Sequence, residues 1–196
     1  MSTGQWITSS DGTRWFFEAG AESLDFAYTG DWGMNNPSWE RLRSTADLGH
    51  WLGERFERID SNEVTERDLM DAVGLRQAIA RLATAVADHL PTSADDVDTL
   101  NLFAATPDVP PALAGGHRQA GAGRVRIGQA LSTLARDAVE ILGESGDERL
   151  RRCHAQDCRM VFHDESRTNN RRWCSMQRCG NRAKVRAHRE RISTQG

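Results

Sequence analysis

The first 152 residues of this 196-residue sequence contain no cysteine, and only one of its 25 basic residues is a lysine, Lys184. There is no run of eighteen apolar residues and no basic-plus-apolar leader, so we expect a cytoplasmic protein with no membrane partner. A phosphate-binding glycine loop and a nucleophile elbow are also absent. The acidic and histidine side chains between residues 25 and 54 show no catalytic spacing. We therefore expect that the protein is not an enzyme.

Charge is distributed unevenly along the chain. Residues 1–148 carry 24 Asp and Glu against 12 Arg, a net charge of −12, whereas residues 149–196 carry 13 Arg and Lys against 4 Asp and Glu, a net charge of +9. All four cysteines lie in the basic segment. A basic segment attracts polyanions by simple electrostatics, and an acidic one does not. This asymmetry predicts two domains with different chemistry.

The acidic segment is predicted to be mostly α-helical. It begins with two aromatic, strand-prone runs, 6–8 and 14–17, on either side of Ser10-Asp11-Gly12, which predicts a β-hairpin. Apolar stripes at three- and four-residue steps then predict four helices, the first three of which can be capped by Ser44, Thr65 and Ser93. Prolines and glycines mark a connection over 107–123, and Gly143 to Gly146 mark the domain boundary. We predict a helical N-terminal domain over residues 1–146 with a short β-hairpin.

Three residues of the N-terminal domain are candidates for a small-molecule pocket: Asp25, Tyr28 and Trp32. Asp25 lies within an apolar run, and a buried carboxylate needs a partner, so it either anchors backbone amides or an arginine or faces a pocket. The structural role, in which Asp25 anchors backbone amides or an arginine, is favoured. Four of the six tryptophans precede residue 40 and suit an apolar cavity, but core packing explains them equally well.

The cysteines form two Cys-x4-Cys pairs separated by fifteen residues: Cys153 and Cys158, then Cys174 and Cys179. Two such pairs can converge on one tetrahedral Zn²⁺, and a complete set of four thiolates indicates one structural zinc per chain. Two disulfides, an iron-sulfur cluster and redox thiols are the alternatives, and a nearby histidine could replace one ligand (His154, His163 or His188). Few apolar residues lie between the pairs, so the segment needs the metal to fold.

A basic helix is predicted to follow the last cysteine. Arg182, Arg186 and Arg189 fall on one face at three- and four-residue steps, with Lys184 to the side. Arg171 and Arg172 add positive charge from the preceding loop, and Asn181 adds hydrogen-bond donors and acceptors. Like charges at helical spacing repel each other unless a counter-charge arrives, which favours binding of nucleic acid, with duplex DNA as the first choice. The alternative is a solvated helix that keeps the segment soluble.

The stretch from Trp173-Cys174-Ser175-Met176 to Cys179-Gly180-Asn181-Arg182-Ala183-Lys184 resembles the bacterial CGNR zinc fingers over residues 149–191. The N-terminal segment resembles the ABATE domain that usually precedes this finger, through Leu24-Asp25-Phe26-Ala27-Tyr28-Thr29 and Ala46-Asp47-Leu48. Tyr28 stands where that family is expected to have Asn. The resemblance implies that the four cysteines are zinc ligands, and that the protein is a stress-induced transcription regulator whose N-terminal domain senses a ligand.

The sequence thus predicts a helical sensor domain followed by a small four-cysteine zinc finger over residues 149–192 that binds nucleic acid. The main alternative is a protein-protein interaction module, whose basic finger docks on an acidic partner or on its own N-terminal domain. An enzyme with a structural zinc is a weaker alternative. Arg182 is expected to contact nucleic acid or to neutralise the zinc cluster, and no sequence feature predicts an oligomeric state.

Overall fold

The computed structural model describes residues 4–8, 12–34, 36–111, 113, 123–143 and 149–193. Ser10 and Asp11 of the predicted turn, most of the predicted connection and the predicted boundary at Gly146 lie outside these residues. The described part is mostly α-helical with two small antiparallel hairpins, which confirms the predicted fold class. None of its helices has the length and apolar character needed to cross a membrane.

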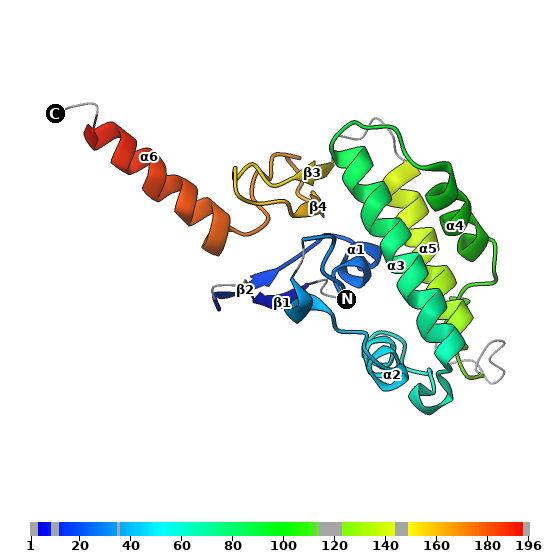
Figure 1. The fold of residues 1–196 in the computed structure, drawn as a ribbon. Coiled ribbons are helices and arrows are strands. Elements are labelled where there is room, and N and C mark those ends of the chain that lie inside the picture. The colour runs from blue at the N-terminus through cyan, green and yellow to red at the C-terminus, as the bar shows by residue number, and fades with distance from the viewer. Residues whose placement is uncertain are drawn as a thin grey trace.

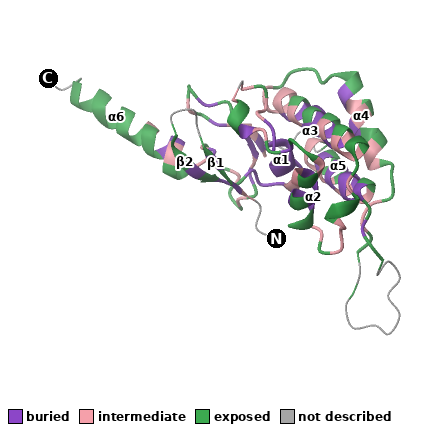
Figure 2. Cartoon of the chain, turned by 60° about the horizontal axis from the view of Figure 1, so that its bottom comes forward, coloured by how far each residue is buried: buried purple, intermediate pink, exposed green. Residues whose placement is uncertain are grey.

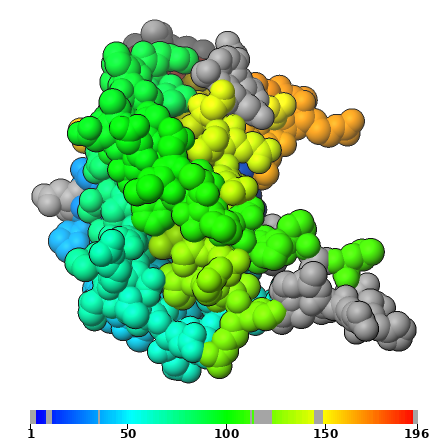
Figure 3. Space-filling model, turned by 90° about the vertical axis from the view of Figure 1, so that its right-hand side faces the viewer, coloured from blue at the N-terminus to red at the C-terminus, as the bar shows by residue number. Residues whose placement is uncertain are grey.

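Three helices form one side of the molecule (Figure 1): α3 (Glu66–Ala87), α4 (Ala94–Ala104) and α5 (Ile127–Gly143). The side chain of Thr65 accepts the backbone N–H of Asp68, and the Asp68 carboxylate accepts from the Thr65 N–H, so a complete capping box begins α3 as predicted. Seen from the side opposite the C-terminal helix, the three helices make one continuous surface (Figure 3). Their inward-facing stripes are buried (Figure 2).

The N-terminal segment packs against these helices. It contains the antiparallel strands β1 (Gln5–Thr8) and β2 (Arg14–Phe17), in which Ile7 faces Trp15, and the helices α1 (Glu22–Ala27) and α2 (Thr45–Gly53). The predicted hairpin is therefore present, and the Ser44 side chain caps α2 as predicted. Short 3-10 turns lie at Pro37–Trp39 and Ser61–Glu63. We call the described residues 4–143 the body.

The described residues 149–193, which we call the finger, contain β3 (Leu150–Arg152), β4 (Val161–His163), a π-helical turn (Met176–Gly180) and α6 (Asn181–Ser193). The strands β3 and β4 pair antiparallel and lie next to α3. Helix α6 projects away from the body (Figure 1).

Body and finger share one hydrophobic core. Phe162 and Val161 of β4 are fully buried and belong to the same cluster of packed side chains as Phe17, Phe26 and Ile79 of the body. Burial of such side chains contributes about 1.5–3 kcal/mol each. The strands of the finger are therefore stabilised by the body, and the predicted division into two domains at residues 146 and 149 stays a prediction.

Candidate metal centre and nucleic-acid interface

The four cysteines converge in the finger. Their sulfur atoms all lie within 4.8 Å of one another, and all four residues are buried. Cys153 follows β3 and its N–H donates to the Met160 carbonyl (2.8 Å), while Cys158 closes a turn onto the Ala155 carbonyl (2.9 Å). Cys179 lies in the π-helical turn that leads into α6. The β3–β4 hairpin and the π-helical turn thus bring together two pairs of cysteines that are distant in the sequence.

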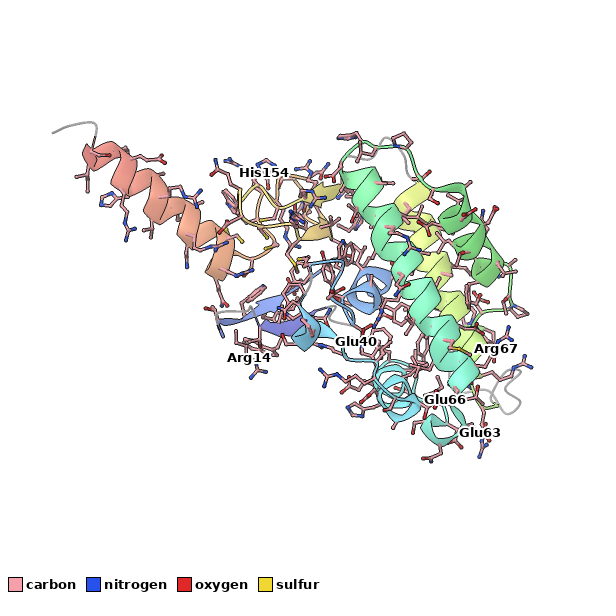
Figure 4. The ribbon with its side chains drawn as sticks, viewed as in Figure 1. Arg14, Glu40, Glu63, Glu66, Arg67 and His154 are labelled. Carbon is pink, nitrogen blue, oxygen red and sulfur yellow. The ribbon has the colours of Figure 1, made fainter. Side chains whose placement is uncertain are left out.

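The cluster has the chemistry of a zinc site. The Sγ of Cys174 lies 3.7 Å from that of Cys158 and 3.5 Å from that of Cys179. Hydrogen bonds with the neighbouring sulfurs, that of Cys153 first, raise the pKa of the Cys174 thiol far above its usual range. Four sulfurs this close can all be thiolates only if a cation neutralises them, and four soft donors suit Zn²⁺. The four cysteines fit one structural zinc ion, which would cross-link the two turns and leave no ligand position for substrate. His154 lies at the outer edge of the finger (Figure 4) and is exposed.

Gly180, the residue after the last cysteine, lies close to two side chains of the finger. A Cβ at this position would lie 2.7 Å from the sulfur of Met176 and 3.3 Å from the ring of Trp173. Real Cβ atoms do not approach sulfur this closely, so a larger residue would displace the flexible, half-exposed side chain of Met176.

Arg182 links the cluster to a neighbouring loop. Its guanidinium makes two hydrogen bonds to the Asp157 carboxylate (2.9 and 3.2 Å) and lies 3.5 Å from the sulfur of Cys179. A guanidinium in this position offsets negative charge on a thiolate cluster and holds the first turn of α6 against the loop between Cys153 and Cys158. The sequence did not point to Asp157, whose only signal is its place beside a ligand.

Arg171 and Arg172 have different environments. The Arg171 side chain donates to the carbonyl oxygens of Trp173 (3.1 Å), Cys174 (2.6 Å) and Glu18 (2.8 Å) and stacks over the ring of Phe162. It therefore holds the cysteine loop together and ties it to the body. Arg172 is exposed, with its guanidinium 5.4 Å from the ring of Trp173.

Helix α6 is exposed along its whole length (Figure 2), and none of its residues is buried. It carries five basic residues and one acidic residue, Glu190. Asn181 donates to the Gln177 carbonyl (3.3 Å), and Arg186 donates to the side chain of Gln156 (3.1 Å). Lys184 and Arg189 are exposed and form no ion pair within the described residues. The predicted basic face is thus divided between residues that contact the finger and residues that face solvent.

The three candidate pocket residues do not lie in one pocket. Asp25 is 1% exposed and accepts the Gly4 N–H at 2.7 Å, and burial raises its pKa to about 6. Tyr28 is buried between body and finger. Trp32 is the one of the three that lines a cleft, which lies between the loop after α1 and helix α3.

The sequence did not predict the contacts between body and finger. The Tyr28 hydroxyl donates to the Val161 carbonyl (3.0 Å) and accepts the Val161 N–H (2.8 Å). Arg152 pairs with Asp88 at the end of α3 and so lowers the pKa of that carboxyl below its usual range.

A glycine shapes the same contact. The His163 N–H donates to the Ala19 carbonyl at 2.7 Å. Gly20 follows with φ +82°, and a Cβ there would lie 2.1 Å from the His163 carbonyl oxygen. Only glycine allows this approach, because it tolerates a positive φ and has no side chain to collide with β4.

Comparison with known families agrees with this geometry. The model of the ABATE family, described as "Putative stress-induced transcription regulator", matches residues 20–145, and the model of the CGNR zinc finger matches residues 149–192. A search of curated proteins found no match. The first family match covers more than half of the chain and ends shortly before the four-cysteine segment begins. The chain therefore belongs to the ABATE family and carries a CGNR zinc finger with a structural zinc site after the ABATE domain.

Proposed function

We propose that this protein is a cytoplasmic transcription regulator that binds duplex DNA through α6, held in place by the zinc site. One observation carries the proposal: α6 is a basic helix with no buried residue. A helix that contributes no buried surface is not maintained by packing of its own, and repulsion among its basic side chains destabilises it. A polyanionic partner would remove that repulsion.

The dimensions of α6 suit a groove of duplex DNA. Its 13 residues give a length of about 20 Å at 1.5 Å per residue. A helix of this diameter enters the major groove, where its side chains reach phosphates on either side and base edges below. Zinc would supply the rigid anchor, because its ligand Cys179 lies directly before the helix.

The structure favours some of the expected nucleic-acid residues over others. Lys184, Arg186, Arg189, Arg172 and Asn181 are exposed and have donors directed to solvent or to weak neutral contacts. Arg182 is paired with Asp157, so we assign it first to the cluster and the loop beside it. The Arg171 side chain donates hydrogen bonds to carbonyl groups within the protein, and we leave it out of the proposed interface.

Fluorescence anisotropy of labelled duplex DNA at several salt concentrations tests the proposal. The zinc-loaded protein should bind with an affinity that falls steeply as salt rises, because each phosphate contact releases counterions. The Lys184→Ala, Arg186→Ala, Arg189→Ala triple variant should bind weakly and lower the salt slope by about three. A variant that replaces Arg43, Arg67 and Arg126, which are exposed on the body, by alanine should bind as the parent does. Absence of binding to both DNA and RNA contradicts the proposal.

The alternative function, a protein-protein interaction module, has one observation in its favour, which is that the finger already docks on its own body through Tyr28 and Arg152. This contact uses β3 and β4 and leaves α6 exposed. Polyglutamate distinguishes an acidic protein partner from nucleic acid. If it displaces the duplex as effectively as unlabelled DNA of equal charge does, α6 recognises acidic surfaces in general.

A further inference from the structure

A cleft of about 630 Å³ lies in the body, between the loop after α1 and helix α3. This volume is within the range of small-molecule sites, roughly 300–1,000 Å³. Its apolar wall consists of Trp32 and small or aliphatic side chains: Ala27, Ala80, Ala85, Leu90 and Pro91. The cleft can therefore take an organic molecule with substantial apolar surface.

The charged residues of the cleft leave one carboxylate without a cationic partner. Arg76 is buried and makes two hydrogen bonds to Glu40 (2.8 and 2.7 Å), which lies between the N-terminal segment and α3 (Figure 4). Arg81 is held by Asp96. Asp31 accepts the backbone N–H of Gly33 (2.9 Å) and forms no ion pair within the described residues. Of the two carboxylates that line the cleft, Asp31 is thus the one with no ion-pair partner among the described residues.

Trp32 is held beside this carboxylate at a conformational cost. Its φ is +53°, in the left-handed region that a non-glycine residue adopts at a cost of about 1–2 kcal/mol. The indole N–H donates to the Thr84 hydroxyl on α3 (2.8 Å), and one ring face stacks on Tyr28 with 4.0 Å between centroids. Trp32 also lines the cleft. A tryptophan ring next to a carboxylate is a typical environment for an organic cation, because the ring face and the carboxylate both attract positive charge.

The same tryptophan is connected to the finger. Tyr28, on which Trp32 stacks, exchanges two hydrogen bonds with the backbone of Val161 in β4. A ligand that holds Trp32 in place also holds Tyr28, and hence the docked position of β4. A ligand that binds only the docked arrangement stabilises it by mass action.

We propose that the cleft lined by Asp31 and Trp32 binds a lipophilic organic cation, and that this binding strengthens the docking of the finger through Tyr28. The biological meaning of the coupling rests on the proposed function, since a regulator would use it to change nucleic-acid binding. The binding site and the docking can be measured without any nucleic acid. Failure of either proposal can therefore be recognised separately.

Isothermal titration of the zinc-loaded protein with tetraphenylphosphonium, and with tetraphenylborate as the anion of the same shape, tests the site. We expect binding of the cation and none of the anion. Asp31→Asn should weaken cation binding about fivefold to tenfold, because asparagine keeps the oxygen that accepts from Gly33 but loses the charge. Asp71→Asn, which removes a carboxylate at the other end of α3, should bind as the parent does. Equal binding of both ions, no binding of the cation, or an unaffected Asp31→Asn variant overturns the assignment.

Transfer of zinc to a chromophoric chelator tests the coupling. Saturating tetraphenylphosphonium should slow zinc release from the parent protein several-fold, because undocking of β4 exposes the cysteine loop. Tyr28→Phe keeps the ring that stacks on Trp32 and should still bind the cation, but its zinc release should no longer respond. An unchanged rate in the parent protein, or an equal response in Tyr28→Phe, contradicts the coupling.

Discussion

The two sides of the finger differ in what holds them in place. The strands β3 and β4 are packed into the core of the body, with Val161 and Phe162 at 0% exposure, whereas α6 has no buried residue. Both sides carry basic residues, but Arg152 and Arg171 of the docked side bond to the body, while Lys184 and Arg189 of α6 are exposed. Contacts with the body therefore explain how β3 and β4 are held in place, whereas buried contacts of this kind do not account for α6. We propose that a nucleic-acid partner accounts for the charge of α6.

Loss of the metal should have the largest effect. Structural zinc sites contribute roughly 10–16 kcal/mol of binding free energy at neutral pH, and the turns that carry the cysteines have little packing of their own. Cys174→Ser should therefore lose zinc and the fold of the cysteine loops and α6. Metal analysis should give one zinc per chain in the parent protein and none in the variant. Ser175→Ala is the control, because its backbone carbonyl, which accepts from Cys179, is retained. Metal-free parent protein with a folded finger would rule out the zinc site.

The docked side should be sensitive to a single added methyl group. Gly20→Ala places a Cβ 2.1 Å from the His163 carbonyl oxygen and should lower the free energy of unfolding by about 3 kcal/mol or more. Gly12 has nearly the same φ, +81°, but no atom within 4 Å of its Cβ position. Gly12→Ala should therefore cost only about 1 kcal/mol, from the positive φ alone. Equal losses in urea unfolding would show that β4 does not dock as described.

Asp25 gives a smaller, pH-dependent effect. Burial raises its pKa to about 6, so between its ordinary value and pH 6 the folded state binds more protons than the unfolded state, and stability falls as pH rises through this window. At pH 7 the ionised Asp25 carboxylate lowers the free energy of unfolding by at most about 3 kcal/mol. Asp25→Asn keeps an acceptor for Gly4 and should stabilise the protein by about 1–2 kcal/mol at pH 7, with a difference that vanishes near pH 4. A stability difference between this variant and the parent that does not depend on pH would contradict a buried Asp25 carboxyl with a raised pKa.

Changes in α6 should have the smallest effect on stability. Replacing Lys184, Arg186 and Arg189 by alanine should change the free energy of unfolding by less than about 0.5 kcal/mol, because these side chains are exposed. The same variant should lose most of its affinity for duplex DNA. Thermal unfolding and anisotropy on one preparation check both statements. A large loss of stability would mean that α6 is maintained by contacts with the rest of the finger.

Residue patterns predicted helices α2 to α6, the first hairpin and the convergence of the cysteines, because helix caps, apolar stripes and ligand spacing are local signals, but they missed the short helix α1. They did not predict how the finger docks. Met160, Val161 and Phe162 are too few apolar residues to form the core of a separate finger, and their partners in the body, such as Tyr28 for Val161, are distant in the sequence. Tyr28 was predicted to line a pocket, and a single sequence does not show that its hydroxyl instead bonds to the backbone of Val161.

The central claim is that β3 and β4 are docked on the body while α6 is exposed until it binds DNA. Hydrogen exchange of the intact, zinc-loaded protein with and without duplex DNA tests this claim most directly. The amides of β3 and β4 should be protected in both states, because they are docked on the body. The amides of α6 should exchange quickly in the free protein and slowly in the complex. Unchanged exchange in α6 at saturating DNA, or rapid exchange throughout β3 and β4, would contradict the account.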